Sequence, residues 1–111
     1  MALTYEVEQH AEVPVIRLHG ELTGDENEFI EAATGLLRRP GVVLDLADVP
    51  FMNSMGLGEL VRIVAQGNVQ EARVVLASPS PFVAGVFQTT QLDRYFEIRP
   101  TLDAAVKVLR P

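Results

Sequence analysis

A short apolar run, a proline-containing turn and an amphipathic helix follow one another between Val42 and Leu60, in the segment VVLDLADVPFMNSMGLGEL. The run Val42–Leu46 is mostly apolar and contains β-branched residues, which is typical of a strand covered on both faces. After the turn at Pro50, apolar residues recur at the helical spacing, at Leu57, Leu60, Val61 and Val64. A buried strand that leads into a helix is the basic unit of an α/β fold, and this is the fold class that we predict.

Two glycines lie in the first turns of this predicted helix, directly after the polar pair Asn53 and Ser54. Both polar residues are favoured helix N-caps. A glycine inside a helix costs about 1 kcal/mol relative to alanine, so Gly56 and Gly58 indicate that another group closely approaches the backbone near Ser54. We therefore expect Ser54 to be exposed at the N-terminus of the helix, with the apolar side of the helix facing the sheet.

Predicted strands and helices alternate along the rest of the chain. The strands are expected at Leu3–Gln9 and Val13–His19, which form a hairpin, and at Val42–Leu46, Arg73–Ala77 and Tyr95–Ile98. The helices are expected from a capping box at Thr23 and Glu26 to Arg39, from Ser54 to a C-cap at Gly67, within residues 78–92, and from Leu102 to Leu109. In the third helix, the side chains of Phe82, Val83, Val86 and Phe87 are expected to face inward. This order predicts one domain over residues 1–111, with a mixed sheet of four to five strands and about four helices.

Composition limits the partners of the chain. It has 111 residues, 48% of them hydrophobic, and a formal net charge of -6. It can therefore bury one core, but it lacks the basic surface with which proteins bind nucleic acids, and an acidic chain is not expected at anionic membranes. No apolar run has the length of a membrane-spanning helix, Met1–Gln9 lacks the features of a signal peptide, and cysteine is absent. We expect a cytoplasmic protein without disulfides or thiolate metal sites.

The segment around Ser54 resembles the signature of STAS domains, in particular that of the bacterial anti-sigma factor antagonists. In that signature a strand leads to an acidic residue, a phosphorylated Ser or Thr, one further residue, Gly and Leu, and Ser54-Met55-Gly56-Leu57 has this form. Gly20-Glu21-Leu22 resembles the G-x-L end of the family's second strand, and Leu92–Ile98 resembles a late family segment with Leu, Phe and Ile. The resemblance implies a single STAS-type domain.

On this resemblance Ser54 is the phosphorylation site, so it is a substrate and not a catalyst. Members of the family bind an anti-sigma factor, usually a serine kinase of the GHKL ATPase type, and so free a sigma factor for transcription. The kinase phosphorylates the serine and ends the association, and a metal-dependent serine phosphatase restores it. The implied function is that of an anti-sigma factor antagonist, without enzymatic activity, metal or cofactor.

The residues expected to bind the partner surround Ser54: they are Phe51, Met52, Asn53, Met55, Gly56, Leu57 and Gly58. Apolar side chains of this set that do not face the core would form a contact patch with aromatic and methionine anchors, which are frequent at interfaces. Asn53 departs from the family, where Asp is commoner. Asn keeps the capping geometry and lacks the charge, so a member that binds without a phosphorylation cycle is an alternative.

Other motifs give weaker indications of chemistry. Gly56-Leu57-Gly58 begins like the dinucleotide fingerprint G-x-G-x-x-G, but the third glycine is missing. Asp45 and Asp48 are compatible with a metal or aspartyl-phosphate site, although receiver domains need a late Lys at a strand end and the only lysine is Lys107. Asp45 is expected to bond to nearby loop backbone and Asp48 to belong to a turn. His10 and His19 have no second histidine at metal-ligand spacing.

Three functions thus follow from the sequence. The first is the anti-sigma factor antagonist controlled at Ser54, with a homodimer as one possible state. The second is a non-phosphorylated scaffold subunit of the same fold, in a stress-sensing assembly or beside a membrane transporter. The third is a small enzyme that uses the acidic loop residues, which the absence of a G-x-S-x-G serine hydrolase motif and of a complete cofactor motif disfavours.

Overall fold

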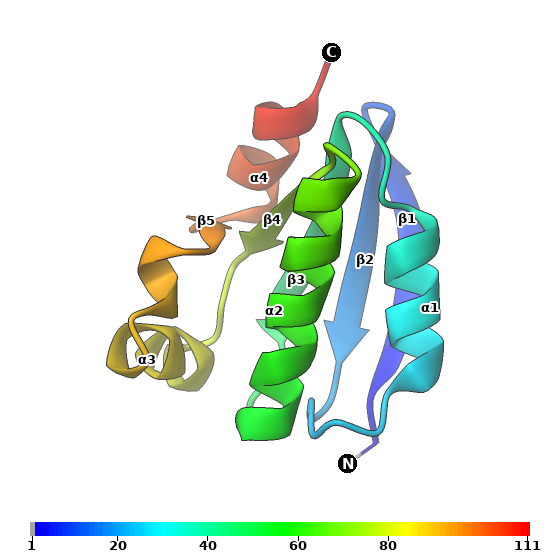
Figure 1. The fold of residues 1–111 in the computed structure, drawn as a ribbon. Coiled ribbons are helices and arrows are strands. Elements are labelled where there is room, and N and C mark those ends of the chain that lie inside the picture. The colour runs from blue at the N-terminus through cyan, green and yellow to red at the C-terminus, as the bar shows by residue number, and fades with distance from the viewer. Residues whose placement is uncertain (1) are drawn as a thin grey trace.

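Five strands form one sheet, and their order in space follows their order in the chain. The computed structural model describes residues 2–111 and contains β1 (Thr4–His10), β2 (Val13–His19), β3 (Gly41–Asp48), β4 (Arg73–Ala77) and β5 (Glu97–Arg99), in the order β1-β2-β3-β4-β5. β1 pairs with β2 in the antiparallel direction, and the later pairs are parallel. The predicted hairpin, mixed sheet and α/β class are confirmed (Figure 1).

The topology decides which face of the sheet each helix covers. The helices are α1 (Asn27–Gly35), α2 (Ser54–Val69), α3 (Pro81–Thr89) and α4 (Leu102–Leu109), with a 3₁₀-helix η1 at Leu92–Arg94. Each parallel strand is added on the same side of the one before, so right-handed crossovers place α1, α2 and α3 on one face. α4 follows the last strand and covers the other face (Figure 1). Within residues 2–111, no helix is long and apolar enough to cross a membrane.

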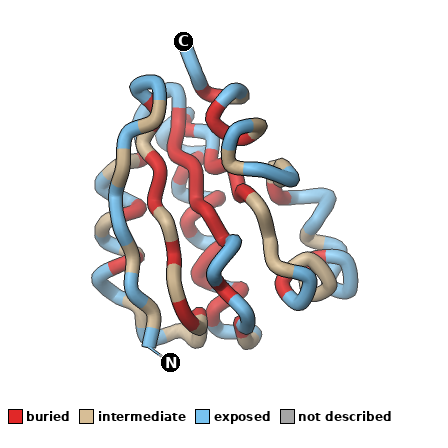
Figure 2. Tube along the Cα trace, turned by 180° about the vertical axis from the view of Figure 1, so that it is seen from behind, coloured by how far each residue is buried: buried red, intermediate tan, exposed pale blue. Residues whose placement is uncertain are grey.

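Two apolar cores lie on opposite faces of the sheet. The larger core joins the first three helices to the sheet through side chains such as Phe29 and Leu60, which are fully buried. The smaller core joins α4 to the strands through side chains such as Val43 and Ala105. β3 lies between the two cores, and its residues from Gly41 to Leu46 are buried (Figure 2). This confirms the predicted central strand covered on both faces.

The two ends of the chain lie at opposite ends of the molecule (Figure 1). β1 begins at the end of the molecule where β2 finishes and α2 begins, and the C-terminus lies at the end where α2 finishes. Close packing at Gly20 agrees with this arrangement, because a Cβ atom there would lie 2.6 Å from the carbonyl oxygen of Ala2. The N-terminal residues therefore run beside the turn that follows β2.

The predicted bounds of the first helix are wrong at both ends. α1 begins at Asn27 rather than at Thr23, and Glu26 is its N-cap rather than the last residue of a capping box. The Glu26 carboxylate accepts hydrogen bonds from the backbone N–H groups of the three preceding residues, which folds them into a turn outside the helix. The helix ends at Gly35 rather than at Arg39.

Other predicted bounds also differ from the structure. β1 is shifted by one residue, to Thr4–His10, and β3 is longer than Val42–Leu46, at Gly41–Asp48. Gly67 is not a C-cap, because α2 continues to Val69. A Cβ atom at Gly67 would lie 2.6 Å from the carbonyl oxygen of Ala72, so this glycine allows the chain after the helix to pack closely against it. The fifth strand spans Glu97–Arg99 rather than Tyr95–Ile98.

Candidate functional site

Ser54 is the first residue of α2, and it is exposed. Asn53 is the N-cap: its backbone is extended, and its Oδ1 atom accepts a hydrogen bond of 2.9 Å from the backbone N–H of Gly56. Asn53 therefore stabilises the start of the helix, whereas the Ser54 hydroxyl takes no part in the hydrogen bonds among residues 2–111. The prediction of an exposed serine at the N-terminus of this helix is confirmed.

The loop between β2 and α1 holds the segment that precedes Ser54. Leu22 and Met52 form an isolated parallel bridge. The backbone N–H of Leu22 donates to the carbonyl oxygen of Phe51 over 3.2 Å, and the N–H of Asn53 donates to the carbonyl oxygen of Leu22, also over 3.2 Å. Because β2 and β3 are neighbours in the sheet, the loops that follow them are brought together at the same end. The position of Ser54 is thus fixed by backbone pairing.

The two glycines after Ser54 have different roles. A Cβ atom at Gly56 would lie 2.1 Å from the carbonyl oxygen of Leu22, so the group that approaches the helix is the protein's own loop. Nothing lies within 4 Å of a Cβ atom at Gly58, and the expectation of a close approach there is wrong. On the loop side, Gly24 is equally close-packed, since its Cβ atom would lie 2.6 Å from that of Met55.

The predicted partner-binding residues divide into exposed and buried groups. Phe51 and Met55 are exposed, at 39% and 64% of their surface, and Asn53 and Gly58 are also accessible. Three members of the set are buried: Met52, Gly56 and Leu57. The side chains of Met52 and Leu57 belong to the larger core, because the bridge to Leu22 and the apolar side of α2 turn them inward. These buried residues can therefore contribute to a contact patch only by positioning the exposed residues beside them.

Phe82 of α3 extends the exposed apolar surface beside Ser54. Its ring lies 5.3 Å from that of Phe51, centroid to centroid, and 48% of the residue is exposed. The prediction that Phe82 faces inward is wrong, whereas Val83 and Phe87 are buried as expected. The helical period is enough to predict that Phe82 is exposed if Phe87 is buried. Residues five apart point about 140° apart around a helix, so Phe82 and Phe87 cannot both face the sheet.

Ser80 sets the position of Phe82. Its hydroxyl donates a hydrogen bond of 2.7 Å to the carbonyl oxygen of Val49, just after β3, and accepts one of 3.4 Å from the N–H of Val83. The serine therefore caps α3 and ties the start of that helix to the segment leading to Ser54. A shallow groove of about 440 Å³ continues the apolar surface along α3, lined by Pro81, Phe82, Gly85, Val86, Thr89 and Thr90.

The electrostatic surroundings of Ser54 favour an anion. The first backbone N–H groups of a helix have no intrahelical partners, and the helix dipole is positive there. The first turn of α2 contains no acidic residue, and the capping residue Asn53 is neutral. A phosphate on Ser54 would lie at the positive end of the helix without a carboxylate in the same turn.

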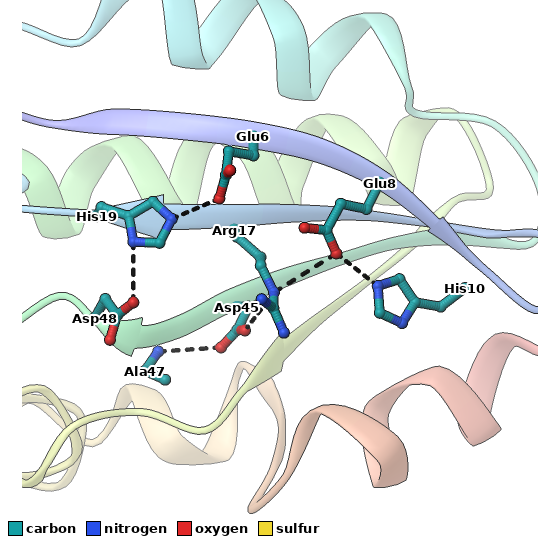
Figure 3. A network of polar contacts seen from close by, with 8 residues as sticks. All are labelled: Glu6, Glu8, His10, Arg17, His19, Asp45, Ala47 and Asp48. Carbon is teal, nitrogen blue, oxygen red and sulfur yellow. Dashed lines mark hydrogen bonds and ion pairs between the residues drawn. The ribbon is translucent and has the colours of Figure 1, made fainter.

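Asp45 lies in a separate polar network on the face of the sheet opposite α1 and α2 (Figure 3). Its Oδ1 atom accepts a hydrogen bond of 3.1 Å from the N–H of Ala47. The predicted bond to nearby backbone is therefore present, but the backbone belongs to β3 and not to a loop. Its other oxygen lies 3.5 Å from Nε of Arg17, which is also 3.6 Å from a carboxylate oxygen of Glu8. Asp45 is thus held in an ion-pair network.

His19 and Asp48 belong to the same face (Figure 3). His19 lies between the carboxylates of Asp48, at 2.9 Å, and Glu6, at 2.8 Å. Asp48 is the last residue of β3 rather than part of a turn. His10 makes a comparable contact of 2.7 Å with Glu8. Across the described residues, no group of three or more His, Asp or Glu side chains is arranged to hold a metal ion.

Comparison with known proteins identifies the family. The STAS domain model matches residues 4–105. An anti-sigma factor antagonist from Mycobacterium paratuberculosis is 26% identical and superposes with a TM-score of 0.85, over 99% of this chain and 96% of that one. SpoIIAA, a Bacillus cell fate determinant solved in its phosphorylated form, is also 26% identical, with a TM-score of 0.68 over 96% of this chain and 100% of that one. An anti-sigma factor antagonist domain protein from Planctomyces limnophilus has the same fold, at 24% identity and a TM-score of 0.81 over 96% and 98% of the two chains. The match over residues 4–105 shows that this chain belongs to the STAS domain family.

Proposed function

We propose that this protein is an anti-sigma factor antagonist, and that phosphorylation of Ser54 ends its association with the anti-sigma factor. The observation that carries the proposal is the exposed Ser54 hydroxyl at a capped helix N-terminus, next to the exposed rings of Phe51 and Phe82. The similarity to antagonists of anti-sigma factors, one of them solved in a phosphorylated form, supports it. The expected partners are an anti-sigma factor that is a GHKL-type serine kinase, and a serine phosphatase.

Phosphorylation at this position is compatible with the fold. A phosphoserine adds about -1.5 to -2 charges and three acceptor oxygens. At the start of α2 these oxygens meet unpaired N–H groups and the positive end of the helix dipole. The capping bond from Gly56 to Asn53 does not involve the Ser54 hydroxyl, so the modification leaves it in place. The modified protein should therefore keep its structure.

The same phosphate opposes binding of the partner. Phe51 and Met55, which are exposed, lie close to Ser54 in the chain, and the exposed ring of Phe82 lies against that of Phe51. A partner that covers these apolar side chains together with Ser54 must remove water from all of them. Burying a doubly charged phosphate without a pairing Arg or Lys carries a large desolvation cost. Association is thus switched off by charge while the fold persists.

Binding measurements with charge variants test this proposal. The partner is captured from native lysate, identified and purified, and its affinity is measured by calorimetry for wild type, Ser54→Ala and Ser54→Asp. We expect Ser54→Ala to bind like wild type and Ser54→Asp to bind at least about tenfold more weakly, which corresponds to about 1.4 kcal/mol. The matched control is Thr34→Asp, which adds the same charge at an exposed position of α1. Equal affinities for all four proteins would contradict a switch at Ser54.

Asn53 favours a second function, that of a scaffold subunit without a phosphorylation cycle. Its side chain performs the capping that the family's usual Asp would perform, but it brings no charge next to the acceptor serine. Incubation with the purified kinase and labelled ATP separates the two functions. Incorporation into wild type but not into Ser54→Ala supports the antagonist cycle, and no incorporation, with binding intact, supports the scaffold.

A further inference from the structure

Glu59 is a buried acid of α2, the helix that begins at Ser54. Only 8% of the residue is exposed, and its carboxyl oxygen Oε1 has no hydrogen-bond partner among the described residues. A buried polar atom without a partner reduces stability, so its presence needs an explanation. The proposed phosphorylation cycle does not use this residue.

Glu26, at the start of α1, faces Glu59 and also closes the loop that precedes the helix. Its carboxylate accepts hydrogen bonds from the backbone N–H groups of Thr23, Gly24 and Asp25, at 2.7, 3.0 and 2.7 Å. An ionised carboxylate is an acceptor only, which suits three donors. The outer side of this turn borders an open hollow of about 930 Å³, which the start of β1 also lines.

The pKa values of the two carboxyl groups are shifted in opposite directions. Burial, followed by the negative charge of Glu26 and a hydrogen bond with its carboxyl group, raises the pKa of Glu59 to about 7, and the opposing effects of the Glu26 backbone and Arg62 are smaller. Burial also acts to raise the pKa of Glu26, but the three backbone hydrogen bonds outweigh it and lower that pKa. Glu26 and Arg62 are the charged groups that act on Glu59 within residues 2–111. Between the lowered pKa of Glu26 and about pH 7 the pair therefore carries one proton, on Glu59.

The loop that Glu26 closes is the one that touches the start of α2. Its Leu22 carbonyl oxygen accepts the hydrogen bond from the N–H of Asn53 and lies against Gly56. Gly24 packs against the side chain of Met55. The contacts on both sides of Ser54 thus depend on a loop whose shape is set by the Glu26 carboxylate.

We propose that Glu26 and Glu59 form a proton-dependent latch. With Glu59 protonated, its carboxyl group lies against that of Glu26, and the loop from Leu22 to Asp25 is held on the start of α2. With Glu59 ionised, two carboxylates repel each other in a partly buried site, and the loop loosens its hold on the residues around Ser54. The latch itself does not depend on the proposed function. Only its consequence, a pH-dependent presentation of Ser54 to the kinase, rests on that function.

An NMR titration of the protein alone tests the latch. The amide signals of Thr23, Gly24 and Gly56 are followed from about pH 5.5 to 8.5 in wild type and in Glu59→Gln. We expect a shared inflection near pH 7 in wild type, and its loss in Glu59→Gln, which resembles the protonated acid but cannot ionise. The matched control is Glu31→Gln, which removes the same charge from an exposed position of α1 and should keep the inflection.

Each outcome of this titration decides the proposal. No inflection in wild type overturns it, and so does an inflection that persists in Glu59→Gln, which would then belong to another group. A second variant, Glu26→Gln, should move the inflection to lower pH, because it removes the negative charge beside Glu59. The measurement needs no kinase, so an inflection of the expected kind supports the latch even if Ser54 is never phosphorylated and the proposed function fails.

Discussion

The region around Ser54 and the open face of the sheet, which is the part that carries Glu6, His19 and Asp48, are held together in different ways. Around Ser54, backbone hydrogen bonds and close packing join Leu22 to Asn53 and Gly56. On the open face, exposed ion pairs such as His19–Glu6 join side chains (Figure 3). Close-packed backbone has no room for an added atom, whereas exposed ion pairs contribute about 1 kcal/mol at most. The comparison predicts that small changes near Ser54 cost more than the loss of a whole ion pair.

The largest effect is expected for Gly56→Ala. The new methyl group would lie 2.1 Å from the carbonyl oxygen of Leu22, and this backbone cannot move without breaking its bond to Asn53. We expect a loss of about 2 to 3 kcal/mol in the free energy of unfolding, measured by urea denaturation. Gly58→Ala is the matched control: its methyl group meets nothing within 4 Å, and it should stabilise the helix by up to about 1 kcal/mol. Similar changes in the free energy of unfolding of Gly56→Ala and Gly58→Ala would contradict the claim that close packing at Gly56 makes this region sensitive.

An intermediate effect is expected at the helix cap. Asn53→Ala removes the acceptor for the N–H of Gly56 and should cost about 1 kcal/mol, whereas Asn53→Asp should change stability by only a few tenths of a kcal/mol. Ser54→Ala should cost less than Asn53→Ala, because the serine hydroxyl is not the cap. Thermal and urea denaturation of the three variants measure these differences. A larger loss for Ser54→Ala than for Asn53→Ala would reverse the assignment of the cap.

The smallest effect is expected on the open face of the sheet. The hydrogen bond with Glu6 raises the pKa of His19, burial opposes it, and Asp48 adds to the rise. A folded-state pKa above the unfolded one means that the stabilisation is complete below about pH 6.5 and is lost as pH rises through the folded-state pKa. His19→Gln should therefore reduce stability at pH 5.5 but not at pH 8.5, by less than about 1 kcal/mol and less still in high salt. An equal loss at both pH values would show that packing, and not charge, is the cause.

Features set by local sequence could be predicted. The apolar residues of Val42–Leu46 indicate a strand covered on both faces, and the structure buries them between two cores. Asn53 and Ser54 precede an apolar helical pattern, so the start of α2 and the exposure of Ser54 followed from capping preferences and the helical period. These predictions hold because the residues that cause each feature are near one another in the chain.

Features set by contacts between distant segments could not be predicted. Gly56 is required by Leu22, which belongs to another loop, so its presence alone did not distinguish it from Gly58. The burial of Glu59 depends on the position of α1, and acidic residues on helices are usually exposed. The predicted start of α1 is too early because the Thr23–Glu26 spacing suits a capping box and also a turn closed by the Glu26 carboxylate.

The opposite placement of the two chain ends determines how this molecule can be attached to a surface or a reporter. The chain enters β1 at the end of the molecule that carries Ser54, and the C-terminus lies at the far end (Figure 1). A fluorophore, affinity tag or sensor chip joined at the C-terminus therefore leaves the serine surface open to a protein partner. The same group joined at the N-terminus would compete for space with a protein that binds over this surface.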